Sequence, residues 1–234
     1  MFHPELPNES VTKSIFYGPN TSLFDPSLGV GNIRAVGSYQ YNEAPAGPKT
    51  DHGMIYQGRL DGSGTWTQID AAPLVPAGHT LQNTIPHSTM GDLVVGNYDM
   101  DSDLSPGHAF IYNLADQSWT GFNPTGSLSV TAYGIWQNGG SNSTQYTIAG
   151  GFSDLNNNGV DEGYVVDYDS KTNTFSHLAI YNFDHMPVRS LVSHFDGITA
   201  TANGYNLTGE YVDLDHGDKT GGFLASIIRT ADGS

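Results

Sequence analysis

The chain has 234 residues, with 8 Lys and Arg against 24 Asp and Glu, and its formal net charge is −16. Nucleic acids and anionic membrane surfaces are bound through clustered Lys and Arg, so we expect neither as a partner. Cysteine is absent, which excludes disulfides and thiolate chemistry, whereas 37% hydrophobic residues predict a packed core.

The N-terminal region predicts one strand and no targeting segment. Residues 1–10 lack the basic and apolar regions of a signal peptide, and no apolar run of 18 residues occurs in the sequence. We therefore expect a soluble chain. The run Ser14–Tyr17 is typical of a strand, and it precedes the first copy of a repeat.

A pattern of three short signatures recurs along the rest of the chain. The first joins a small residue and a glycine to an aromatic residue, at Val36–Tyr39, Val95–Tyr98, Ala149–Phe152 and Thr208–Tyr211. The second lies at His52–Tyr56, His108–Tyr112, Glu162–Val166 and Gly221–Ala225, and the third at Thr65–Ile69, Ser118–Phe122 and Thr174–Leu178. The glycines of the first signature are 59, 54 and 59 residues apart, a period typical of repeat architectures.

Each repeat unit predicts four antiparallel strands. Its apolar runs are short, rich in Val, Ile, Tyr, Phe and Thr, and bounded by turn residues. The innermost strands are expected near 85–90, 131–136 and 191–195. The run 188–195 has apolar residues at helical spacing, but it occupies a strand position in the repeat, so we predict a strand there. Radially repeated four-stranded sheets are the blades of a β-propeller.

The predicted fold class is an all-β, four-bladed β-propeller in a single domain, 1–234. The blades are expected at roughly 20–70, 71–123, 124–180 and 181–234. The last unit lacks its fourth strand, so we expect the N-terminal strand 12–18 to complete that blade and close the ring. Alternatives are four blades of a longer propeller and an open solenoid.

These signatures resemble the bacterial HAF-type repeat family, named for a His-Ala-Phe triplet that stands here at His108–Phe110. The resemblance spans almost the whole chain through short motifs. It implies a bacterial propeller-like repeat protein, extracellular or periplasmic, and brings no established activity. Glu162 and Gly221 replace the leading His in two units, so that His is not expected to be an invariant ligand.

Two loops between strands predict Ca²⁺ as a cofactor. The loop 154–162 has oxygen ligands at alternating positions and a glycine at its sharp turn; its candidate ligands are Asp154, Asn156, Asn158, the carbonyl of Val160, and Glu162. This spacing is similar to calcium loops of integrin-type propellers and dockerins. The second loop offers Asp99, Asp101 and Asp103 but lacks that glycine. The alternative interpretation is a polar turn without an ion.

The inner strands of a propeller line a central channel, and two of them carry a histidine, His87 and His194. With Asp25 and Asp196 nearby in the predicted inner layer, they are candidate catalytic acids and bases or transition-metal ligands. The alternative is that each histidine is hydrogen-bonded to a neighbouring strand and fills the channel.

Three further residues are candidates for ligand binding. Tyr133 and Arg189 belong to the predicted inner layer, and Trp136 stands next to two side-chain amides without a counterpart in the other units. An indole beside amides suits stacking on a sugar ring, although a hydrophobic residue at the rim would look the same.

No nucleophile elbow, zinc-protease motif or phosphate-binding loop occurs in the sequence. We therefore favour a calcium-stabilised binding module for a carbohydrate or another small ligand. The alternatives are a hydrolase or lyase that uses His87 and His194 in the channel, and a structural or adhesive repeat domain.

Overall fold

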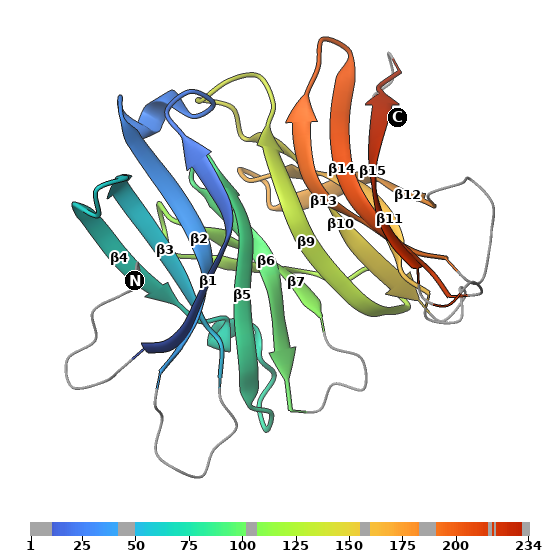
Figure 1. The fold of residues 1–234 in the computed structure, drawn as a ribbon, viewed down its shortest axis with the longest axis horizontal. Coiled ribbons are helices and arrows are strands. Elements are labelled where there is room, and N and C mark those ends of the chain that lie inside the picture. Colours follow the sequence, from blue (N-terminus) through green and yellow to red (C-terminus); the bar gives the residue numbers. More distant parts are fainter. Residues whose placement is uncertain are drawn as a thin grey trace. The chain divides into compact units, whose positions relative to one another are not determined.

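The computed structural model describes residues 11–41, 50–101, 107–154, 160–182, 191–214, 217 and 219–230. These residues form four antiparallel sheets and two single turns of 3-10 helix (Figure 1). The predicted fold class, an all-β four-bladed β-propeller, is confirmed. No helix in the described ranges is long and apolar enough to cross a membrane.

The chain divides into two compact units, Met1–Gly121 and Phe122–Ser234. The first unit holds two sheets. The first sheet contains β1 (Val11–Thr21), β2 (Asn32–Tyr41), β3 (His52–Arg59) and β4 (Gly64–Ile69), and the second contains β5 (Leu81–Met90), β6 (Leu93–Met100), β7 (His108–Asn113) and β8 (Trp119–Phe122), whose last residue begins the second unit. The 3-10 turns are η1 (Pro26–Leu28), between β1 and β2, and η2 (Ala72–Leu74), between the two sheets.

The second unit repeats this plan with one strand fewer. Its first sheet contains β9 (Ser127–Gln137), β10 (Gln145–Asp154), β11 (Glu162–Asp169) and β12 (Thr174–Tyr181), and its second contains β13 (Leu191–Ala200), β14 (Gly204–Asp213) and β15 (Lys219–Ile228). The predicted inner strands at 85–90, 131–136 and 191–195 fall within β5, β9 and β13, which confirms them. The run with helical spacing is thus a strand from Leu191 onward.

The expectation that residues 12–18 complete the last sheet is wrong. They belong to β1, which pairs with β2 from Val11↔Tyr41 to Thr21↔Ile33, so the last sheet has three strands in the described part of the chain. Only a short connection separates β1 from β2, and pairing neighbours in sequence costs far less chain entropy than pairing the two ends of the chain. The strand β1 is therefore the inner strand of the first sheet, as β5, β9 and β13 are in the other three sheets.

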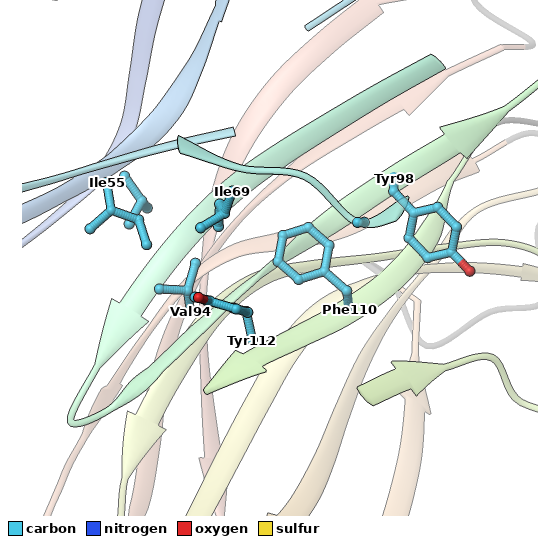
Figure 2. Close-up of a cluster of buried hydrophobic side chains, with 8 residues drawn as sticks. Ile55, Ile69, Val94, Tyr98, Phe110 and Tyr112 are labelled. Carbon is cyan, nitrogen blue, oxygen red and sulfur yellow. The ribbon is translucent and has the colours of Figure 1, made fainter. Parts of the chain in front are cut away.

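The core of the first unit lies between its two sheets. Buried apolar side chains of both sheets, together with Ala71 from the segment that connects them, form one cluster there: Val36, Ile55, Ile69, Ala71, Val94, Tyr98, Phe110 and Tyr112 (Figure 2). The second unit has an equivalent cluster built around Phe195. The middle strands β2, β3, β6, β7 and β11 each carry at least four consecutive buried residues, so both of their faces are covered. Burial of this apolar surface stabilises the fold by about 25 cal/mol per Å².

The repeated glycines are required by a close approach between the two innermost strands. A Cβ at Gly37, Gly96, Gly150 or Gly209 would stand 2.0, 2.1, 1.8 or 2.4 Å from a main-chain oxygen of the inner strand. No side chain fits at such a distance, which is why the period of the sequence is carried by glycine.

Candidate functional site

Each inner strand carries a β-bulge opposite the repeated glycine. The register shifts between Phe16 and Gly18, Pro86 and Ser88, Ala132 and Gly134, and Phe195 and Gly197. The extra residues of these bulges are, in the same order, Tyr17, His87, Tyr133 and Asp196. A bulge redirects the side chain of its extra residue, and bulges are frequent beside functional sites. Three of these four residues are sequence-predicted site residues.

In the first unit the bulge brings His87 against aromatic and amide groups. Its ring centroid lies 4.7 Å from that of Tyr17, and its Nε2 lies 2.9 Å from Asn97 Oδ1. Asn97 in turn donates from Nδ2 to Asp99 Oδ1 at 3.4 Å, and Asn83 donates to the other oxygen of Asp99 at 3.0 Å. His87 is thus held in place by a polar chain that continues to Asp99.

Asp25, expected to act with the histidines, is buried and occupied by local hydrogen bonds. Its Oδ1 accepts from the backbone N–H of Ser27 at 3.1 Å at the start of η1, and its Oδ2 accepts from Gly91 N at 3.0 Å. Gly91 lies in the turn between β5 and β6, so these bonds tie the two sheets of the unit together. The carboxylate of Asp25 therefore has a structural role, because it satisfies backbone N–H groups of η1 and of the β5–β6 turn.

In the second unit the bulge of β13 gathers a histidine and two carboxylates. His194 Nε2 lies 3.1 Å from Asp196 Oδ1, and Glu210 on β14 is the direct cross-strand partner of His194. The Tyr133 ring lies 5.2 Å from the His194 ring. The hydrogen bond with Asp196 raises the pKa of His194, burial opposes this, and the charges of Asp196, Glu210 and Asp161 raise it further.

These three residues form a group with metal-ligand character. One ligand atom each from His194, Asp196 and Glu210 lie within 4.8 Å of one another, and no other group of three His, Asp or Glu side chains among the described residues does so. His194 and Asp196 were predicted as site residues, whereas Glu210 was not. Glu210 could have been found from its position in the repeat, because it directly follows the repeated glycine Gly209. In the β5–β8 sheet, the residue at the same position is Asn97, which contacts His87.

A separate pocket of about 660 Å³ lies where the sheets of the second unit turn at one end. Trp136, Asn138, Asn203, Tyr205 and Arg229 are among its lining residues. They come from the end of β9, the β13–β14 turn, the start of β14 and the end of β15. The predicted ligand-binding residue Trp136 therefore lies beside polar groups that the sequence places up to about ninety residues away.

Hydrogen bonds connect the polar residues of this pocket. Tyr205 donates its hydroxyl to Asn138 Oδ1 at 2.7 Å, and Asn138 donates from Nδ2 to Thr147 Oγ1 at 2.9 Å. The Arg229 guanidinium lies over the Tyr205 ring, 5.2 Å from its centroid, and donates to Thr147 Oγ1 at 3.1 Å. The side chains are fixed before any ligand arrives.

Asp167 on β11 is hydrogen-bonded to two residues of this network, Arg229 and Thr147. It accepts hydrogen bonds from Arg229 and from Thr147 Oγ1, the latter at 2.8 Å, and His177 Nδ1 lies 3.0 Å from its other oxygen. Burial raises the pKa of Asp167, but these hydrogen bonds and the Arg229 charge outweigh burial and keep the pKa below its ordinary value. Arg229 and Asp167 form an ion pair that sequence reasoning missed, because no local motif marks either residue.

The predicted calcium ligands are only partly described. Asn156, Asn158, Asp103 and the side chain of Asp154 lie outside the described residues, as does the predicted ligand-binding residue Arg189. Glu162 accepts a hydrogen bond from Asn182 at 2.8 Å, and Val160 lies two residues before the start of β11. Asp101 accepts from the Thr80 backbone N–H at 3.1 Å, which lowers its pKa despite an opposing effect of burial. The calcium site stays a prediction.

The two predicted channel histidines belong to different units, His87 to the first and His194 to the second. Each has its own partners: Tyr17 and Asn97 contact His87, while Tyr133 and Asp196 contact His194. The acid–base pairing of the two histidines stays a prediction.

No protein-family model and no curated protein sequence matches the chain. Among solved structures, the chain is similar to the GH32 β-fructofuranosidase BmSUC1 of Bombyx mori, with a TM-score of 0.45 and 13% sequence identity. A mutant of that enzyme in complex with sucrose gives the same values. The similarity covers 93% of this chain and 47% of the enzyme, so the chain spans about half the length of these structures.

Proposed function

We propose that this β-propeller protein is a binding module that takes a neutral carbohydrate in the pocket beside Trp136. The observation that carries the proposal is the composition of this pocket, in which an indole ring stands next to a hydrogen-bonded set of amide, phenol and guanidinium groups. Enzyme activity is not part of the proposal.

The chemistry of a sugar matches both sides of this pocket. A pyranose ring has an apolar C–H face that packs on an aromatic ring, while its hydroxyl groups need donors and acceptors at fixed places. Asn138 and Tyr205 supply such groups, and their mutual hydrogen bond orders them beforehand, so binding costs little side-chain entropy.

Charge and size favour a small neutral sugar over an acidic one. The Arg229 guanidinium is paired with Asp167, so the pocket offers no uncompensated positive charge from this side chain to an anionic ligand. The pocket volume of about 660 Å³ lies within the roughly 300–1,000 Å³ of common small-molecule sites.

The test is a glycan array followed by calorimetric titration with the neutral mono- and disaccharides that give signal. Trp136→Ala is expected to weaken binding at least about tenfold, because it removes the stacking surface, equivalent to about 1.4 kcal/mol. Trp66→Ala is the matched control, since Trp66 is also a half-buried tryptophan but lies on β4 of the first unit.

Two results would contradict the proposal. One is an array on which the wild-type protein binds no neutral glycan. The other is a Trp136→Ala protein that binds the same glycans as tightly as the wild type or as Trp66→Ala. In either case the structural or adhesive alternative gains support.

A further inference from the structure

We infer that the last sheet holds a binding site for a divalent transition-metal ion, with His194, Asp196 and Glu210 as its ligands. None of the three lines the pocket beside Trp136. The metal site and the carbohydrate pocket are therefore separate inferences, and each has its own variants.

The β-ladder itself brings the three ligands together. His194 and Glu210 are directly opposite each other on neighbouring strands, and side chains of such pairs share one face of the sheet. The bulge adds Asp196 to the same neighbourhood, with its Oδ1 3.1 Å from His194 Nε2. Ligand atoms around a Zn²⁺ ion, at bonds of about 2.0–2.2 Å, stand roughly 3.3–3.6 Å apart. The three ligand atoms lie within 4.8 Å of one another, so they must move somewhat closer together to bind an ion. Rotations of the Asp196 and Glu210 side chains, which are both exposed, supply this movement.

The histidine is packed against its neighbours, whereas the side chains of Asp196 and Glu210 are exposed and have room to rotate. Tyr133 lies against the imidazole, and Gly151 on β10 leaves room for it, because a Cβ at Gly151 would stand 3.1 Å from His194 Cβ. A fixed nitrogen ligand with two adjustable oxygen ligands lowers the cost of ordering the site when the ion binds.

The donor set selects the class of ion. One imidazole nitrogen and two carboxylate oxygens suit Zn²⁺ and similar first-row ions, whereas Ca²⁺ takes six to eight oxygen ligands. The two carboxylates balance the charge of a divalent ion. Three protein ligands leave a fourth position of a tetrahedral ion open for water or a bound ligand.

The equivalent position in the β5–β8 sheet of the first unit provides a comparison. There the corresponding residues are Ile85, His87 and Asn97, which offer one ionisable ligand instead of three. The scaffold is the same, with the same bulge and the same repeated glycine. Zinc binding that depends on the scaffold or on any exposed histidine would therefore respond to changes at His87 as well.

The experiment is a Zn²⁺ titration of the purified protein, freed of metal, in competition with a chromophoric chelator. The wild type is expected to bind one Zn²⁺ per chain, and excess Ca²⁺ is expected not to displace it. Glu210→Gln and Asp196→Asn should each weaken binding about tenfold or more, and His194→Ala should abolish it. His87→Ala should leave binding unchanged.

The proposal is overturned if the wild type binds no Zn²⁺ at one per chain. It is also overturned if Glu210→Gln and Asp196→Asn bind as the wild type does, or if His87→Ala weakens binding as much as they do. These two carboxylate-to-amide variants keep side-chain size at exposed positions, so circular dichroism should show a folded protein even where His194→Ala fails to fold.

Discussion

At the scale of single residues, the second unit depends on a polar network whose members lie far apart in sequence. Asp167 on β11 binds Arg229 at the end of β15 and Thr147 on β10. A largely buried carboxylate with several donors is stabilising only while all partners are present, because each loss leaves a buried group unsatisfied. The same network positions Asn138 and Tyr205 in the pocket proposed to bind carbohydrate.

The lowered pKa of Asp167 predicts how this network responds to acid. Because the folded pKa lies below the unfolded value of about 3.9, the stabilisation is complete above about pH 4 and is lost as the pH falls through the folded pKa. Asp167→Asn should lower the free energy of unfolding by about 1.5–3 kcal/mol at pH 7. Urea denaturation at several pH values measures the difference between the two proteins.

This difference should shrink as the pH falls from about 4 through the folded pKa of Asp167, because the unfolded chain takes up a proton at this carboxylate before the folded protein does. A difference that stays constant down to pH 2.5 would mean that the shape of the side chain matters and its charge does not.

At the scale of elements, the repeated glycine and the bulge opposite it form one device. The glycine lets the inner strand approach, and the extra residue of the inner strand turns its side chain out of the regular alternation. Of the four extra residues, His87 contacts Asn97 and Asp196 contacts His194. The device thus places one extra side chain at the same position of every sheet, and the identity of this side chain differs from sheet to sheet.

Replacing one of these glycines should destabilise the fold strongly. In Gly150→Ala the new Cβ would stand 1.8 Å from the Thr131 carbonyl oxygen, and relieving such a clash with backbone costs about 1–3 kcal/mol or more. Gly222→Ala is the matched control on β15, since its Cβ would meet only Gly209 O at 3.7 Å. Chemical denaturation should show a change within about 0.5 kcal/mol for the control. Equal effects of the two substitutions would show that the close approach is not what selects glycine.

At the scale of the whole molecule, the charge of −16 carries a cost of self-repulsion. Nine of the 24 acids lie in or beside three inter-strand loops at equivalent places in the sequence repeat: Asp99, Asp101, Asp103, Asp154, Asp161, Glu162, Asp213, Asp215 and Asp218. Cations that gather at these loops would relieve the repulsion, and the ligand spacing of the loop 154–162 predicts a specific calcium ion among them.

Calcium should therefore raise the melting temperature beyond the effect of Na⁺ at equal ionic strength. An ion that binds only the folded protein, at about a hundred times its Kd, adds about 2.7 kcal/mol, or roughly 5–10 °C for a chain of this size. Asn156→Ala should remove this increment, and Asn142→Ala, an asparagine in the β9–β10 loop, should keep it. Identical melting temperatures in Ca²⁺ and Na⁺ would show that the acids act only through net charge.

The sequence by itself determined the parts of this protein that rest on local pattern. Its four-fold period, its short apolar runs and its glycines predict the sheets, their number and the inner strands of three of them, because strand formation depends on the residue pattern within a short segment. It also marked His194, Asp196 and Trp136 as residues whose type suits a site.

Only the tertiary structure decided which residues meet. It decided that β1 pairs with β2. It also decided, through the register of the strands, that Glu210 lies opposite His194 and that Arg229 contacts Asp167. A shift of one residue would turn each of these side chains to the other face of its sheet. Register is set by the packing of whole sheets, so the repeat predicts the scaffold and the folded chain alone decides the composition of each site.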